Sequence, residues 1–364
     1  MTRPARHGAL AGVRVVELGG IGPVPFAGML LADLGADVVR IDRPGSALPT
    51  PSVVNRGKRS AALDLRDPQD NAVARRLAAE ADVLIEGFRP GVAERLGLGP
   101  AQCWADNPRL VFGRMTGWGQ DGPLALDVGH DISYIATTGA LHAIGTASGP
   151  PVPPLALLGD LGGGAMFLVT GVLAALREAS LSGLGQVVDA AIVDGVAALM
   201  TPIYGMLADG EWIDERGSNL LDSGRPWYDV YATSDGAWMA VGAIEEPFWL
   251  ALLEVVGIAP DAYDRGDPTC WNALRQELTT IFAGRTQAEW EKAFAGSDAC
   301  AAPVLSMTEA PRSPHLRARG TFAEVDGVAL PEPAPRLSRT PSARGAAPTP
   351  GGDTAAVRDG WPDA

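Results

Sequence analysis

His130 and Asp160 are two acid/base side chains of opposite charge type in separate glycine-containing segments, residues 129–131 and 159–164. General acid/base groups are often held in loops. A pair opposed across a carbon acid can remove a proton from one face and return it on the other. Structural explanations also exist, because a loop histidine is often solvated and an aspartate ahead of an apolar helix is often an N-cap. The two residues alone leave both interpretations open.

Composition indicates a globular protein. The chain has 364 residues, 46% of them hydrophobic, and a mean hydropathy of +0.08, enough for roughly two or three domain-sized cores. Residues 1–12 contain no apolar signal-peptide region, and the longest apolar run, residues 166–176, is shorter than a bilayer span. The three cysteines are widely spaced, which favours a reducing compartment. We expect a cytoplasmic protein without a membrane span.

Charge is unevenly distributed along the chain. The net charge of −14 argues against a nucleic-acid partner. Basic residues nevertheless concentrate in one region, at Arg40, Arg43, Arg56, Lys58, Arg59, Arg66, Arg89 and Arg95. Arginine suits bidentate contacts with phosphate, so this region predicts a site for a small polyanion. Solvated surface arginines would give the same pattern for most of these positions.

Apolar strands alternate with helical segments in the first part of the chain. The predicted strands are 13–18, 36–41, 82–86 and 110–114, and the helices between them are 26–34 and 72–81. This alternation indicates βαβ units and a parallel sheet. Residues 162–179 have the length and apolar face of a long helix.

The pattern changes near residue 225. A hairpin is predicted around 234–236, followed by helices at 247–256, 271–283 and 287–295. We therefore predict a Rossmann-like α/β large domain over residues 1–224 and a smaller α+β domain over 225–325. Residues 326–364 form a C-terminal segment that ends in an extended tail rich in proline and alanine.

Several cofactor and metal chemistries lack their motifs. Residues 19–22 place glycines where a dinucleotide-binding turn would sit, but Pro23 and Pro25 remove two of the N–H donors that the turn needs. A nicotinamide or flavin cofactor is therefore disfavoured. The chain also contains no HExxH, no closely spaced Cys/His quartet, no GxSxG and no Walker loop. We expect neither a metal site nor an external cofactor.

Five ordered blocks carry a family resemblance: residues 18–30, 34–41, 55–59, 63–66 and 81–91. They resemble the family III CoA-transferase (CaiB/BaiF-type) superfamily, and the similarity runs from about residue 10 to about residue 340. Within that superfamily, residues 129–131, 159–160 and 243–245 are most similar to the α-methylacyl-CoA racemase branch.

The resemblance implies an acyl-CoA thioester substrate, with CoA as part of the substrate, and a role in fatty acid and lipid metabolism. It also implies an interlocked homodimer, with the active site between one chain's large domain and the other's small domain, and a C-terminal segment that returns to the large domain. The positions matching the CoA contacts are Arg43, Leu63, Asp64, Leu65, Arg66, Gly87, Phe88, Arg89 and Arg95. Those matching the acyl-CoA contact loop are Gly129, Asp131, Ile132, Ser133 and Tyr134.

The implied reaction is epimerisation of a 2-methylacyl-CoA at its α-carbon by 1,1-proton transfer through an enolate. The resemblance places His130 as the base on one face and Asp160 on the other, with Glu245 supporting His130 and Glu246 as the neighbouring alternative. Asp160 then needs a pKa raised by burial. We expect the enolate oxygen to be held by the backbone N–H of Asp160 or its glycine neighbours.

Three alternatives stay open. In a CoA-transferase, the carboxylate of Asp160 would attack the acyl-CoA and form a mixed anhydride, which needs no proton-shuttling histidine. A CoA-binding protein without catalysis and a nicotinamide-dependent reductase are less favoured, the first by the presence of His130, Asp160 and Glu245 and the second by the prolines of the first turn. The acyl chain is not determined, although Met115, Trp118, Met200, Met206 and Trp227 are candidate pocket residues or ordinary core.

Overall fold

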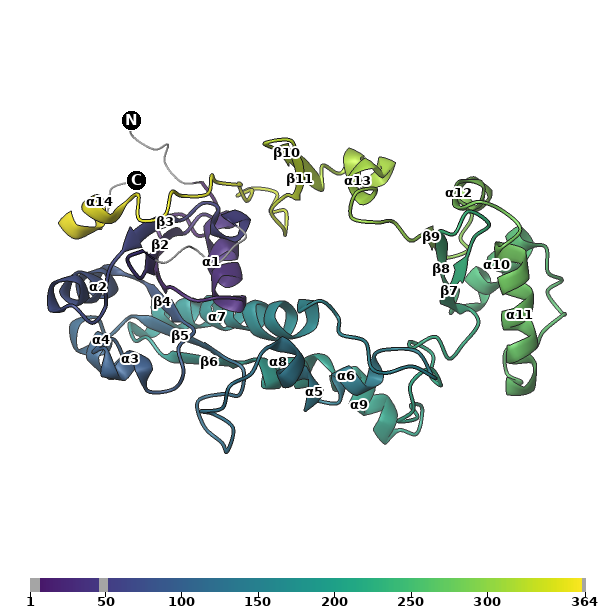
Figure 1. Ribbon diagram of the computed structural model, residues 1–364, viewed down its shortest axis with the longest axis horizontal. Helices are drawn as coiled ribbons and strands as arrows, with labels where there is room; N and C mark the ends of the chain where they lie inside the picture. The colour runs from purple at the N-terminus through teal and green to yellow at the C-terminus, as the bar shows by residue number, and fades with distance from the viewer. Residues whose placement is uncertain (1–6, 46–51, 362–364) are drawn as a thin grey trace. The chain divides into compact units, whose positions relative to one another are not determined.

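The structure is a computed structural model that describes residues 7–45 and 52–361. The chain folds into two compact units (Figure 1). The larger unit comprises Met1–Leu141, Pro153–Thr201 and Glu332–Ala364, and the smaller comprises His142–Val152 and Pro202–Pro331. The division differs from the predicted boundary at residue 224, because residues 142–152 and 202–224 group with the smaller unit.

A six-stranded parallel sheet forms the centre of the larger unit. Its strands lie in the order β3-β2-β1-β4-β5-β6. They are β1 (Arg14–Leu18), β2 (Asp37–Asp42), β3 (Arg59–Ala62), β4 (Val83–Glu86), β5 (Val111–Thr116) and β6 (Val187–Ala191). The predicted Rossmann-like parallel sheet is confirmed. Its central strands are apolar on both faces because helices cover both faces.

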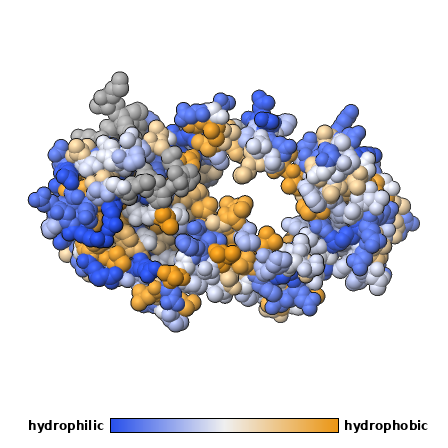
Figure 2. All heavy atoms as spheres, viewed as in Figure 1, coloured by the Kyte–Doolittle hydropathy of each residue, from blue (hydrophilic) through white to orange (hydrophobic). Residues whose placement is uncertain are grey.

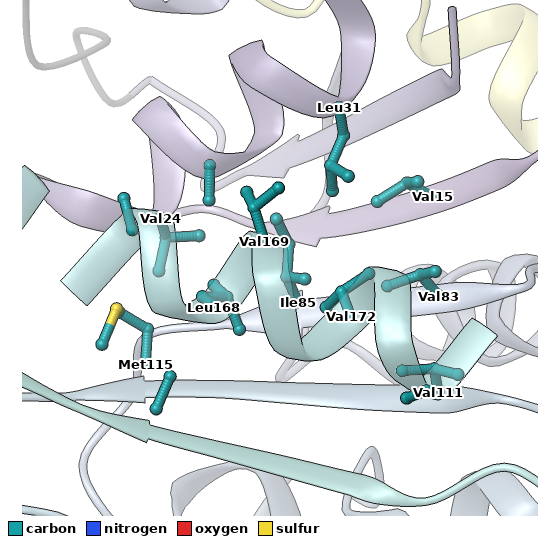
Figure 3. Close-up of a cluster of buried hydrophobic side chains, with 14 of the residues drawn as sticks. Val15, Val24, Leu31, Val83, Ile85, Val111, Met115, Leu168, Val169 and Val172 are labelled. Atoms are coloured by element: carbon teal, nitrogen blue, oxygen red, sulfur yellow. The ribbon is translucent and has the colours of Figure 1, made fainter. Parts of the chain in front are cut away.

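Alternate residues of the central strands pack into two separate cores. Val15, Val83, Ile85 and Val111 face α1 (Pro23–Asp33) and α7 (Phe167–Ser182), as Figure 3 shows for side chains of both helices. The neighbouring strand residues face the helices of the opposite layer, α2 (Pro68–Glu80), α3 (Val92–Arg95) and α4 (Pro100–Asp106). This alternation follows from the two-residue period of a strand.

The predicted long helix starts earlier than expected and has two parts. A π-helical segment, η2 (Leu157–Met166), runs directly into α7. Together they form an apolar helix, Leu157–Ser182, that is long enough to cross a membrane by length and composition alone. Leu168, Val169 and Val172 of α7 are buried against the sheet (Figure 3), as in a core helix of a globular protein.

The C-terminal segment packs on the sheet edge, which differs from the extended tail that its composition suggests. A short helix, α14 (Thr354–Asp359), buries Val357 completely. The Ser60 N–H of β3 donates to Asp353 Oδ2 at 2.9 Å. β3 is the edge strand of the sheet, and an edge strand leaves backbone donors that need partners. Composition does not predict this packing, because the hydrogen-bond partners of β3 are side chains such as Asp353 that lie outside any strand.

The smaller unit combines an antiparallel sheet with helices. Its sheet has the order β7-β8-β9, with β7 (Tyr228–Ala232), β8 (Trp238–Gly242) and β9 (Ala301–Pro303). The predicted hairpin between β7 and β8 is present, and α10 (Glu246–Val256), α11 (Trp271–Phe282) and α12 (Gln287–Phe294) pack against the sheet around an aromatic core.

The remaining elements of the two units are α5 (Asp131–Ala136), α6 (Ala140–Ala143), α8 (Ile192–Leu199), α9 (Thr201–Ala208), α13 (Pro314–Ala318), β10 (Phe322–Val325) and β11 (Val328–Pro331), with short 3-10 turns at Ser52–Asn55, Pro268–Cys270 and Ala310–Arg312.

Candidate active site

A cavity of about 740 Å³ opens over the carboxyl ends of β1, β4 and β5. Ligands of open α/β sheets bind at this edge, next to the strand where the order reverses. Its lining comes from residues 21–24, 87–90, 115–118, 125 and 127–130, with Ser133, Tyr134, Asp160 and Ile192. The structure thus brings His130 and Asp160 to one cavity, together with Met115 and Trp118 from the candidate pocket residues.

Asp160 lies in the first turn of η2, not in the loop expected from its sequence. The segment is wound as a π-helix, in which the Leu161 N–H donates to the Ala156 carbonyl at 3.2 Å. π-helical turns are rare and frequently occur at functional sites. The glycines that follow serve packing, because an added Cβ on Gly163 would lie 2.5 Å from Val196 Cγ2 of α8. These contacts account for a small residue at position 163.

The Asp160 carboxyl group is half-buried, and its pKa is raised to about 6. Burial is the largest cause and the negative charge of Asp131 adds to it, whereas His130 acts in the opposite direction. Gly22 lies close against another side of the carboxyl group, because a Cβ added to Gly22 would lie 2.8 Å from Asp160 Oδ2. A carboxyl group with this pKa populates both protonation states near neutral pH, as an acid/base group must.

The backbone N–H of Asp160 is already engaged, because it donates to Asp131 Oδ1 at 2.7 Å. Of the two predicted enolate donors, the Asp160 N–H is therefore wrong for this conformation, whereas the N–H groups of its glycine neighbours stay a prediction. A different set of donors lies nearby, since α5 begins at Asp131 directly after His130. The first turn of any helix carries N–H groups without partners inside the helix.

His130 is the exposed N-cap residue of α5, and its side chain makes no capping hydrogen bond. Its carbonyl accepts from the Ser133 N–H at 2.8 Å. Tyr134 holds the preceding turn, because its hydroxyl donates to the Gly129 carbonyl at 2.5 Å. The Tyr134 ring also meets Trp118 edge-on, with centroids 4.9 Å apart. The imidazole is thus presented from a fixed backbone.

A second cavity of about 420 Å³ lies over β1, β2 and β3. Most of the predicted CoA-binding residues gather in the two cavities. Arg43 and Leu63–Arg66 line the second, Gly87 and Arg89 the first, and Phe88 and Ile21 line both. Arg95, Asp131 and Ile132 line neither cavity. Arg95 lies in α3 between two residues of the second cavity, Val92 and Leu96.

The basic region predicted as a polyanion site divides into exposed and buried side chains. Arg43, Arg66 and Arg89 are exposed, whereas Arg40 and Lys58 are buried and both pair with Glu17 at 2.7 Å. Arg56 and Arg59 are also buried and pair with Asp33 and Asp37.

The buried pairs support the turn between β1 and α1. Lys58 Nζ donates to the Pro25 carbonyl at 2.8 Å, and Arg40 Nη2 donates to the Gly20 carbonyl at 3.2 Å. Sequence reasoning missed this network, and the only signal in the sequence was Glu17 inside an otherwise apolar strand. The network fixes a turn that borders both cavities.

Glu86 is a further residue that sequence reasoning missed. It ends β4 beneath the first cavity, is buried, and accepts from the Phe88 N–H at 2.6 Å. Burial raises its pKa to about 7, although the hydrogen bond and the charge of Arg114 oppose that rise. Its place at the end of a buried strand, ahead of residues 87–90, was the signal that could have found it.

Glu245 belongs to the smaller unit, where it is the exposed N-cap residue of α10 and makes no capping hydrogen bond. Its neighbour Glu246 is paired with Arg265. Arg265 Nη1 also donates to the Ile244 carbonyl at 2.7 Å. Of the two carboxylates, Glu246 is the one held by the smaller unit itself.

The part of the chain that the structure describes contains no group of three or more His, Cys, Asp or Glu side chains placed to hold a metal ion.

Known proteins match this chain over nearly its whole length. Residues 10–354 match CoA-transferase family III. The chain is 46% identical to α-methylacyl-CoA racemase of Mus musculus over 339 residues, which cover 92% of this chain and 87% of that protein. The Homo sapiens α-methylacyl-CoA racemase is 43% identical over 337 residues, covering 92% and 88%.

A transferase and a solved structure also match. Succinyl-CoA–D-citramalate CoA-transferase of Chloroflexus aurantiacus is 36% identical over 269 residues, covering 70% of this chain and 66% of that protein. The crystal structure of a CAIB/BAIF family protein from Brucella suis superposes with a TM-score of 0.82 and 26% identity, covering 97% of this chain and 99% of that one. The parallel sheet, its cavities and these matches agree, and the chain belongs to the family III CoA-transferases.

Proposed function

We propose that this protein epimerises 2-methylacyl-CoA thioesters at the α-carbon. The observation that carries the proposal is that His130 and Asp160 line one cavity and that the pKa of Asp160 is raised to about 6. Two relatives that share 46% and 43% of their residues with this chain are named α-methylacyl-CoA racemases, which supports the same reaction class.

The two cavities suggest how the thioester lies. The second cavity presents the exposed Arg43 and Arg66, which suit the phosphates of the CoA nucleotide. Ile21 and Phe88 border both cavities, so the pantetheine arm passes from the second cavity to the first beside these two residues. The thioester and α-carbon then reach the cavity that contains His130 and Asp160, where Met115 and Trp118 supply apolar surface for the acyl chain.

The proton moves in two steps. One acid/base group removes the α-proton, and the electron pair of the broken C–H bond passes to the thioester oxygen as an enolate. The N–H groups of Asp131 and Ile132, at the start of α5, are the proposed donors for that oxygen, because the Ser133 N–H already donates to the His130 carbonyl. The group on the opposite face, already protonated, then delivers its proton to the α-carbon and inverts the configuration. No external cofactor enters this scheme.

We also propose that the protein is a homodimer. Large apolar side chains are exposed on the elements after residue 154, and Figure 2 shows such side chains among polar ones on the viewed face. They include Leu155, Leu157, Met166, Leu199, Tyr204 and Leu207. The apolar helix α9 buries none of its residues in the described structure. Exposed apolar patches of this kind mark interfaces, and a second copy is the occupant that the family resemblance implies.

Dimerisation gives Glu245 a role. We propose that Glu245 of the partner subunit reaches His130, orients its imidazole and stabilises its charged form. Glu246 is less suited, because Arg265 already holds it. Interlocking of the chains, a cytoplasmic location and a role in fatty acid and lipid metabolism remain predictions.

The test is isotope exchange in deuterated water. A single epimer of a 2-methylacyl-CoA is incubated with the purified protein and without an acceptor acid, while α-carbon label and configuration are followed together. Deuterium uptake with loss of configuration is expected, and both are expected to fall at least about a hundredfold in His130→Ala and Asp160→Asn. Unchanged exchange in both variants would refute the proposed acid/base pair.

CoA transfer is the second candidate, and the Chloroflexus aurantiacus transferase that matches this chain favours it. In that reaction the Asp160 carboxylate attacks the thioester carbonyl, CoA leaves as a thiolate, and an acyl anhydride forms. Hydroxylamine would trap that anhydride, and His130→Ala would retain transfer to a free carboxylic acid. Transfer in the wild type without α-proton exchange would establish the transferase instead of the racemase.

A further inference from the structure

The side chain of Asp131 is turned toward the backbone of Asp160. Asp131 Oδ1 accepts the Asp160 N–H at 2.7 Å. The same oxygen lies directly against Gly159, where an added Cβ would overlap it. The Asp131 carboxylate therefore rests on the 159–160 peptide, in the first turn of the π-helical segment.

We infer that Asp131 is a positioning residue for Asp160: it fixes the Asp160 backbone and holds a second negative charge beside the Asp160 carboxyl group. The role rests on the proposed function, in which Asp160 is a general acid and base. It differs from a substrate contact, because the Asp131 carboxylate is engaged within the protein.

The neighbours of Asp160 leave Asp131 as the main charge that acts on it. His130 lowers the pKa of Asp160, whereas Asp131 raises it. Tyr134 of α5 is a neutral phenol whose own pKa is raised by burial and by the charge of Asp160. The turn before α1 brings the uncharged Gly22 against the carboxylate. The other charged groups of the packed elements, Asp194 of α8 and Arg114 of β5, act on Asp189 of β6.

The hydrogen bond and the charge of Asp131 support each other. The hydrogen bond from the Asp160 N–H keeps the Asp131 carboxylate beside the Asp160 carboxyl group. The Asp131 charge raises the pKa of Asp160, in addition to the larger effect of burial. The geometry thus combines two functions in one side chain: an acceptor that orients the acid and a charge that favours its protonated form.

Asp131→Asn separates these functions, because asparagine keeps an acceptor oxygen and loses the charge. The pKa of Asp160 is expected to fall by about one pH unit. The acid limb of the kcat/KM profile, where the fully protonated enzyme loses its first proton from Asp160, then moves to lower pH by the same amount. At pH 7, kcat/KM falls by up to about tenfold, because fewer Asp160 side chains carry the proton to be delivered. The fold-change in kcat/KM is the same for both directions of epimerisation, because the ratio of the two values is the equilibrium constant, which is close to one and which the enzyme does not change.

A direct titration provides the structural readout. Protein labelled with carbon-13 at the aspartate Cγ is titrated by NMR, and Asp160→Asn identifies the Asp160 signal. Its midpoint is expected near pH 6 in the wild type and lower in Asp131→Asn. Asp131→Ser is a second neutral variant in case the asparagine variant does not fold. Asp127→Asn is the matched control, because it removes one charge from the lining of the same cavity, whereas the hydrogen bond to the Asp160 N–H comes from Asp131.

The outcomes separate the two levels of the proposal. An Asp160 midpoint that stays in place in both neutral variants, or that moves equally in Asp127→Asn, overturns the role of Asp131. A lowered midpoint in the neutral variants supports it, whatever the reaction. Absence of α-proton exchange in the wild type overturns the proposed function but leaves the measured coupling between Asp131 and Asp160 intact.

Discussion

Gly22→Ala tests how the turn before α1 constrains Asp160. Gly22 has φ 67° and ψ −119°, a conformation that L-residues avoid at a cost of about 1–3 kcal/mol. The new Cβ would lie 2.8 Å from Asp160 Oδ2 and 3.6 Å from its Cγ. Ordinary contact between such atoms needs about 3.4 Å or more, so the carboxylate must move by roughly half an ångström.

We expect kcat to fall by about tenfold to a hundredfold, because small misplacements of a catalytic group are costly. The free energy of unfolding should fall by about 1–3 kcal/mol. Steady-state epimerisation and urea unfolding measure the two effects. The control is Gly20→Ala in the same turn, where an added Cβ meets nothing closer than Val24 Cβ at 4.0 Å. A Gly22→Ala enzyme with kcat within about twofold of the wild type would refute the reasoning.

Three further predictions concern the buried groups. Lys58→Met should lower the free energy of unfolding in urea by about 3 kcal/mol, because it leaves Glu17 buried without its ammonium partner. The double variant with Glu17→Gln should recover part of that loss. Additive losses of the two substitutions would contradict the pairing. Glu86 has a folded-state pKa raised from 4.5 to about 7, so its contribution to stability is present below pH 4.5 and is lost as pH rises toward 7. Glu86→Gln should remove that part of the pH dependence, and an unchanged slope would count against a protonated Glu86. Val172→Ala, in the core of Figure 3, should cost about 1–3 kcal/mol in the same assay, whereas a change at the exposed Leu181 should cost far less.

The parallel sheet could be predicted because its determinants are local. Residues 14–18 and 83–86 are apolar enough to be buried on both faces, and each is joined to a helix by a short turn. The antiparallel hairpin could be predicted for the same reason, since Gly236 at a positive φ sits where the turn requires it. Their residue types and glycine-containing segments brought His130 and Asp160 to attention, and the family resemblance assigned them opposing roles. No local pattern gives their spatial proximity.

Other features depended on partners distant in the chain. The sequence by itself shows a run of glycines at 162–164 and a set of basic residues between positions 40 and 95. Only the tertiary structure decides that Gly163 packs on α8 and that Lys58 is buried against Glu17. It also turns Asp131 onto the Asp160 backbone. The physical reason is that burial, and with it pKa and charge pairing, is a property of the packed neighbours, which propensity and spacing along one segment do not contain.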